Sequence, residues 1–142
     1  MNIELTKKPQ GVTIVEGFPG FGLVGTISTE FLLDHLDVEK IGHIWFSEMN
    51  PMIAVHDKKV IDPLGIFYNK KNNLIILHAL TNVNGLEWKL AESINHIAKT
   101  LRAKEVISLE GVGALEKPST GKTNSLKSGN TYFYSSKHKT QW

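Results

Sequence analysis

Apolar residues fall in short blocks along the chain, and the spacing within the blocks changes. Continuous apolar runs cover residues 11–16, 41–46 and 72–80. Runs of this length without helical spacing predict buried strands. Two further runs, 52–57 and 63–69, predict short strands, and the residues between them suit a connection. We expect these two strands to form an antiparallel insertion beside a parallel centre.

The segment after Gly22 has the 3.6-residue period of a helix. Its pattern predicts an amphipathic helix. The residues on its apolar face are Leu23, Val24, Ile27, Phe31 and Leu32, and those on its polar face are Thr26, Thr29, Glu30 and Asp34.

A second helix is predicted near residue 87. Asn84 and Glu87 have the spacing of a capping box, in which each side chain bonds a backbone N–H of the other residue. Residues 104–114 then predict a strand that ends in a glycine turn. The apolar stripe of the helix contains Leu90, Ala91, Ile94, Ile97, Ala98 and Leu101.

The order of these elements is strand, helix, strands, helix, strand. This order indicates an α/β layered fold with a mixed sheet. A uniform dinucleotide-binding alternation is excluded, because no helix fits between Ile41 and Leu80.

Composition places the chain among ordinary globular proteins, with 142 residues, 41% hydrophobic and 21% charged. The chain has no cysteine, which excludes disulfides and thiolate sites. Residues 1–10 are polar and no apolar run could span a bilayer, so we expect a cytoplasmic protein without membrane contact. All 14 acidic residues lie in 1–116, whereas 117–142 hold five lysines and no acid. We therefore expect one domain, with an α/β body over 1–116 and a basic loop and tail over 117–142.

The glycine turn that follows the first strand has two interpretations. Its G-x-G-x-x-G spacing is that of a nucleotide-binding turn, whose backbone N–H groups cradle a phosphate at a helix N-terminus. The same glycines also allow a sharp turn and a close approach of helix and sheet, and the bulky Phe18, Pro19 and Phe21 favour this packing role. The candidate ligand-binding residues of the turn and its rim are Gly17, Gly20, Gly22, Gly25, Glu48, Glu110 and Gly111.

Other motifs predict no chemistry. Residues 119–123 end like a phosphate-binding loop, but Glu116 stands where that loop needs glycine. The six histidines lack metal-ligand spacing, and no Ser–His–Asp set can be assembled. The sequence thus predicts no catalytic residue, no metal site and no cofactor. Nucleic-acid binding by the basic tail is the least favoured interpretation.

Four segments in order and spacing resemble the proteasome assembly chaperone family, especially its archaeal members. They are "EGFPGFGLVGTISTEFLLDHL", "SEMNPMIAVHDKKV", "NNLIILHAL" and "GLEWKLAESINHIAKTLRAKEVISLEGVGA". The resemblance covers roughly residues 11–115.

The resemblance implies a three-layer α/β/α fold with a mixed, largely parallel sheet, similar to nucleoside phosphorylases. It also implies a non-enzymatic chaperone that acts through protein–protein contacts with proteasome subunits and with further copies of itself. The alternative is a small-molecule protein or enzyme of phosphorylase-like fold that binds a nucleotide or anion at the glycine turn. Family members are commonly longer, so we expect a truncated or altered end over Tyr132 to Trp142. The archaeal factors that contact the proteasome carry a C-terminal hydrophobic–Tyr–any motif, which Thr140-Gln141-Trp142 lacks, so the resemblance assigns proteasome contact to no particular residue.

Overall fold

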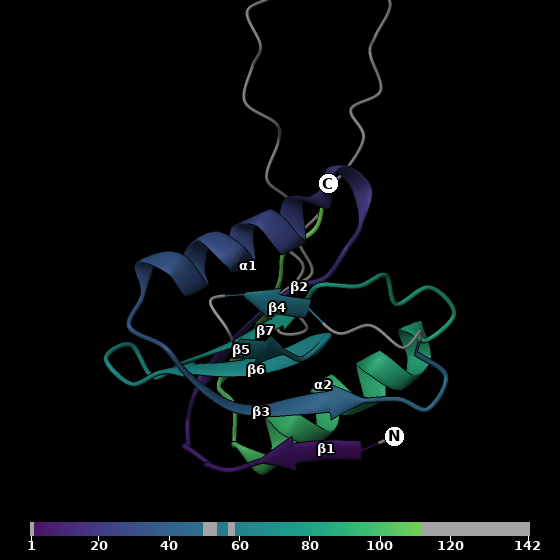
Figure 1. Cartoon of the computed structure of the whole chain (residues 1–142). Helices are drawn as coiled ribbons and strands as arrows, with labels where there is room; N and C mark the ends of the chain where they lie inside the picture. The colour runs from purple at the N-terminus through teal and green to yellow at the C-terminus, as the bar shows by residue number, and fades with distance from the viewer. Residues whose placement is uncertain (1, 50–53, 57–58, 112–142) are drawn as a thin grey trace, which may run out of the picture. The chain divides into compact units, whose positions relative to one another are not determined.

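A six-stranded sheet organises the computed structural model, which describes residues 2–49, 54–56 and 59–111 (Figure 1). The strand order is β1-β3-β6-β7-β2-β8. The apolar runs 11–16, 41–46 and 72–80 supply three of its four inner strands, β2, β3 and β7, as the sequence predicts. The bounds are β1 Asn2–Leu5, β2 Thr13–Gly17, β3 Glu39–Trp45, β6 Leu64–Asn69, β7 Leu74–Ala79 and β8 Glu105–Ser108.

Parallel and antiparallel pairings divide this sheet into two halves. Strand β2 pairs in parallel with both β7 and β8. The pairings β1–β3, β3–β6 and β6–β7 are antiparallel. The predicted α/β class and mixed sheet are confirmed, but the sheet is less parallel than the resemblance implied. The reason is that β3 and β6 are joined without a crossover helix.

The predicted antiparallel insertion is only partly correct. Strands β4, Ala54–His56, and β5, Lys59–Ile61, form a separate two-stranded sheet. Strand β6, predicted to belong to that insertion, lies in the main sheet between β3 and β7. Its Leu64 and Ile66 are buried in the core. The free energy gained by burying these side chains favours a place in the main sheet, even though the run is short.

Helices cover both faces of the sheet, which gives the predicted three layers. After the 3₁₀ turn η1, Phe21–Leu23, helix α1 spans Val24–His35 and lies on one face, and helix α2, Glu87–Thr100, lies on the other (Figure 1). None of the described helices is long and apolar enough to cross a membrane.

The main hydrophobic core lies between the sheet and α2. Alternate residues of a strand point to opposite faces, so Ile14 of β2 and Ile75 and Leu77 of β7 point toward α2. Leu90 and Ile97 of α2 pack into the same cluster. The remaining buried members are Val12, Ile41, Ile44, Phe46, Leu64, Ile66, Ala79, Val83 and Leu101.

Helix α2 begins without the predicted capping box. No side chain caps its first turn, and the N-cap residue is Leu86. The Glu87 carboxylate instead accepts a hydrogen bond of 2.9 Å from the backbone N–H of Gly85, which lowers the pKa of Glu87. Asn84 uses its own N–H to bond the Asn82 side chain. The helix therefore begins three residues after the predicted cap.

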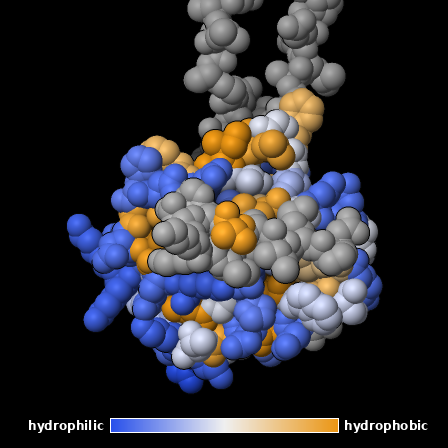
Figure 2. Space-filling view, viewed as in Figure 1, coloured by the Kyte–Doolittle hydropathy of each residue, from blue (hydrophilic) through white to orange (hydrophobic). Residues whose placement is uncertain are grey.

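Helix α1 turns the opposite face to the sheet from the one its pattern predicts. Gly25 and Thr29 are buried against the sheet, whereas Ile27 is 59% and Phe31 58% exposed. Figure 2 shows apolar side chains gathered on the surface of this region. The amphipathic prediction is wrong here because the sheet approaches α1 too closely to admit large side chains.

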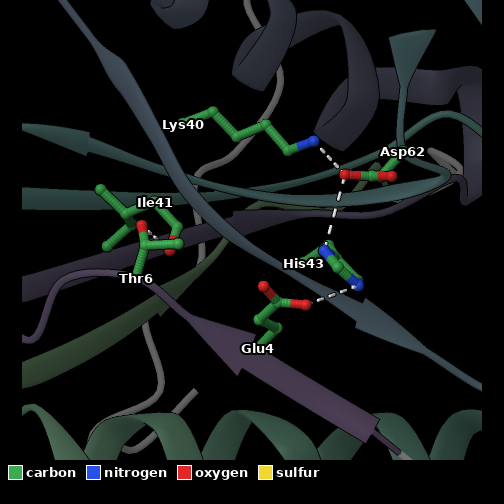
Figure 3. A network of polar contacts seen from close by, with 6 residues as sticks. All are labelled: Glu4, Thr6, Lys40, Ile41, His43 and Asp62. Carbon is green, nitrogen blue, oxygen red and sulfur yellow. Dashed lines mark hydrogen bonds and ion pairs between the residues drawn. The ribbon is translucent and has the colours of Figure 1, made fainter.

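Strand β1 was not predicted, because it is short and only Ile3 and Leu5, which pack against the core, are apolar. It is held at the sheet edge by backbone pairing with β3 and by the polar contacts shown in Figure 3. Thr6 donates both its N–H and its hydroxyl to the carbonyl of Ile41. His43 lies 3.8 Å from the Glu4 carboxylate and 3.7 Å from that of Asp62, which also pairs with Lys40. The predicted basic loop and tail over residues 117–142 lie outside the described residues.

Candidate functional site

The glycine turn is a packed junction of η1, α1 and the two parallel strands β2 and β8. Gly22 has φ +66°, in the left-handed region that glycine adopts without strain. Leu23, with φ 55°, continues the turn and is half exposed. Gly20 is exposed at the start of the turn, with φ −145°. The turn itself thus needs a glycine at Gly22, but not at Gly20.

Gly17 and Gly25 set the distance between α1 and the sheet. A Cβ on Gly17 would lie 2.7 Å from Cγ2 of Thr29. A Cβ on Gly25 would overlap the carbonyl oxygen of Leu109 and lie 2.9 Å from that of Phe18. Both glycines therefore allow direct backbone contact between helix and sheet, which supports the packing interpretation of the motif.

The chain after β8 runs against the same turn. A Cβ on Gly111 would overlap the carbonyl oxygen of Phe21, so this glycine also serves a backbone contact. The Glu110 side chain lies beside Gly20, where an added Cβ would meet its Oε1 at 3.7 Å. The structure therefore brings the predicted turn residues together with Glu110 and Gly111.

Glu48 does not join this group. Its carboxylate pairs with Lys89 of α2 and accepts a hydrogen bond of 3.0 Å from the Ser47 hydroxyl. The hydrogen bond from Lys89 is the main cause that lowers the pKa of Glu48 to about 2. Glu48 lines neither cavity beside the turn. It thus occupies a surface ion pair in this structure.

A cavity of about 260 Å³ lies beside the turn, at the carboxyl ends of β2 and β8. In α/β sheets, ligands commonly bind outside these strand ends. Its walls come mainly from α2, from the loop after β2, and from the end of β8 and the residues that follow it. The lining residues are Glu16, Phe18, Pro19, Gly20, Val83, Glu87, Leu90, Ala91, Ile94, Ser108, Leu109 and Glu110.

Glu16 is the one nine-tenths-buried carboxyl among these lining residues, with 9% of its surface exposed. Burial raises its pKa, the proximity of Glu110 acts in the same direction, and a hydrogen bond from the Ser108 hydroxyl opposes them. Sequence reasoning missed both residues. No local signal marks them, because it is the parallel register of β2 and β8 that pairs Glu16 with Ser108 and puts both side chains on the same face.

A second cavity, of about 500 Å³, lies on the α1 side of the same turn. It is lined by Leu23 and Thr26 of the turn and helix and by Asn82 and Asn84 of the loop before α2. The buried hydroxyl of Thr26 has no hydrogen-bond partner in the described part of the chain. No Lys, Arg or His is among the described residues lining either cavity. Within the described ranges, no cluster of His, Cys, Asp or Glu is placed to hold a metal ion.

The surface of η1 and α1 carries a continuous apolar row, which we call the outer α1 row. Positions 24, 27 and 31 lie on one helix face. The ring of Phe31 also stacks on that of His35, with 3.8 Å between their centroids. The acids Glu30 and Asp34 are exposed on the same helix. The row consists of Phe21, Leu23, Val24, Ile27 and Phe31, which are 45–66% exposed.

Comparison with protein families gives a match to the PAC2 family over residues 14–139. The chain belongs to this family. No curated protein matches the chain closely enough to count as a relative.

Solved structures give the same result for the fold. Pyrococcus furiosus PbaA, described as an archaeal homolog of proteasome-assembly chaperone, is 32% identical in its monoclinic form, with a TM-score of 0.71 over 82% of this chain and 50% of that one. PbaB of the same organism, an archaeal proteasome activator, is 21% identical, with a TM-score of 0.62 over 75% of this chain and 49% of PbaB. A Thermoplasma acidophilum protein of unknown function is 16% identical, with a TM-score of 0.67 over 78% of this chain and 46% of that protein. The present chain spans about half the length of each.

Proposed function

We propose that this chain is a non-enzymatic, chaperone-like protein that acts by binding other proteins in proteasome assembly. Membership of the PAC2 family and the likeness to the PbaA structure support a chaperone role. By the same likeness we propose an archaeal type of protein that works in the cytoplasm. Its partners are subunits of the proteasome core particle and further copies of itself.

The outer α1 row is the observation that carries this proposal. An amphipathic helix normally buries its apolar face in its own core. Here Gly25 and Thr29 occupy the buried face, and the large residues Ile27 and Phe31 remain in solvent. Exposed apolar patches of this kind mark protein interaction sites. The row therefore serves contacts outside the described fold.

Self-association has a second support in strand β8. Among the described residues β8 pairs with β2 alone, and no described strand pairs with its other edge. Its Val106 and Ile107 are 43% and 38% exposed. An open edge with apolar side chains favours pairing with another strand.

The small-molecule alternative has weaker support at the glycine turn. Backbone atoms occupy the space beside Gly17 and Gly25, and three carboxylates line the cavity beside Gly20. Carboxylates repel phosphate, and no cationic side chain of the described structure lines the cavity to offset them.

The proposal is tested by replacing Ile27 and Phe31 together with glutamate. We expect the variant to lose capture of purified proteasome core-particle subunits and to self-associate less, as measured by light scattering. Because both residues are exposed, its melting temperature should stay within a few degrees of the wild type.

Trp88→Glu is the matched control, because Trp88 is an 85% exposed residue of α2, away from the row. This variant should bind as the wild type does. Equal binding by the double variant and the wild type would contradict the role of the row. A wild-type chain that stays monomeric and captures no subunit would contradict the proposed function itself.

A further inference from the structure

The floor of the 260 Å³ cavity is an incompletely paired carboxyl group. Glu16 is nine-tenths buried, and its Oε1 accepts a hydrogen bond from the neutral Ser108 hydroxyl. Among the described residues, the Ser108 hydroxyl is the one hydrogen-bond donor found for this carboxyl group, and no cationic side chain lies beside it in the cavity lining. A buried carboxylate without a counter-ion is unfavourable, and pairing with a cation relieves that cost.

The rim strengthens the same charge preference. Glu87 and Glu110 line the cavity with Glu16, and its described lining contains no cationic side chain. Low-dielectric walls focus the field of such charges into the cavity. The lining therefore attracts a cation and repels an anion.

The apolar walls and the small volume of the cavity limit the class of cation that it can bind. Phe18, Val83, Leu90 and Ile94 supply apolar surface above the carboxyl group. The volume lies just below the ~300–1,000 Å³ typical of sites for drug-sized ligands, so it suits a ligand the size of one side chain. In the described structure the three carboxylates are too dispersed to hold a metal ion, which points to an organic cation.

We propose that this cavity binds an alkylammonium group, with the ammonium on Glu16 and the alkyl stem against the apolar walls. Two sources supply this chemistry: a lysine side chain of a protein partner, or a free alkylamine. The ammonium donates to Oε2 of Glu16, while Ser108 holds Oε1. The site lies on the α2 side of the sheet and does not depend on the outer α1 row.

The test uses n-butylamine as the probe, with n-butanol and butyrate as neutral and anionic analogues. Amide chemical shifts of the whole chain are followed by NMR during titration at pH 7.5. We expect saturable shifts with butylamine centred on Glu16, Leu90 and Ser108. The two analogues should give weaker responses, because they lack the positive charge.

Glu16→Gln should weaken butylamine binding by about tenfold to a hundredfold, since it replaces a charge-assisted hydrogen bond with a neutral one. Ser108→Ala keeps the carboxylate and should still bind. Glu92→Gln is the matched control, because it removes the same charge from an exposed position of α2 outside the cavity. Butylamine shifts that are absent, or that are unchanged in Glu16→Gln, would overturn the proposal.

A short peptide with one central lysine, and the same peptide with acetylated lysine, distinguish the two sources. Binding of the unmodified peptide but not of the acetylated peptide assigns the site to a lysine of a protein partner. Binding of butylamine without either peptide assigns it to free amines. Equal binding of butyrate and butylamine would refute the charge argument. The double variant of Ile27 and Phe31 should bind butylamine normally, so failure of the proposed function leaves this result intact.

Discussion

The Thr29 hydroxyl lies 2.8 Å from Nδ1 of His78 and joins helix α1 to strand β7. Both residues are buried, at 0% and 4% exposure. The same hydroxyl also lies 3.0 Å from the carbonyl oxygen of Gly25, one turn earlier in the helix. A polar pair thus holds α1 at a place where the pattern predicts a polar outer face.

Replacing Thr29 with valine should destabilise the protein by about 1–3 kcal/mol. Valine has nearly the same shape but leaves Nδ1 of His78 buried without a partner. Urea unfolding measures the change. Thr29→Ser keeps the hydroxyl and should lose clearly less stability than the valine variant. A valine variant as stable as the wild type, or a serine variant that loses more stability than the valine variant, would contradict the role of the hydrogen bond.

Acidification should loosen the same contact through His78. Burial lowers the pKa of His78 below its usual value of 6.5. The unfolded chain therefore takes up a proton near pH 6.5 that the folded chain refuses, and stability falls as the pH drops below 6.5 toward the folded pKa. Thermal melts from pH 8 to 5 test this slope. His78→Gln should remove part of it, whereas His96→Gln, at an exposed position of α2, should leave it unchanged.

Gly25 should not tolerate a side chain. Gly25→Ala drives a methyl group into the carbonyl oxygen of Leu109, and we expect a loss of about 1–3 kcal/mol, with Gly25→Val worse. Gly20→Ala is the control from the same motif, since its Cβ meets its nearest neighbour at an ordinary 3.7 Å. An unchanged melting temperature in Gly25→Ala would contradict the packing interpretation.

Glu16 should make the protein less stable as the pH rises. Because burial raises its pKa above the usual 4.5, the folded chain keeps a proton that the unfolded chain releases. Stability therefore declines from about pH 4.5 upward through the raised folded pKa. Glu16→Gln should flatten this decline, and Glu92→Gln should not. The free energy of unfolding, measured by urea titration at several pH values, decides between these outcomes.

The sequence predicted the elements of the fold better than their contacts. Apolar runs located β2 and β7, because a strand buried on both faces has a nearly continuous apolar sequence. The apolar stripe located the core face of α2. Strand β1 escaped prediction because its four residues, with only Ile3 and Leu5 apolar, are too short a pattern to mark a strand without its pairing with β3. The place of β6 in the main sheet also escaped prediction, because the apolar run at 63–69 does not show which strands it pairs with.

At the candidate site, the pattern of α1 led to the wrong face. Hydrophobic periodicity assumes that a helix binds its sheet through large side chains. Here Gly17 and Gly25 bring the backbones together and leave no room for them. The pairing of Glu16 with Ser108 is equally non-local, because 92 residues separate them in the chain. The glycine spacing indicated a close approach of helix and sheet, but it did not indicate which face of α1 would make the contact.

The way α1 is fastened has a consequence for how this family can diversify. Its inner face is fixed by Gly25 and Thr29, while the sheet takes most of its stability from the core on the α2 side. Mutations along Ile27 and Phe31 can therefore accumulate without threatening the fold. Under the proposed function, changes at these positions would exchange one binding partner for another while the scaffold beneath stays constant.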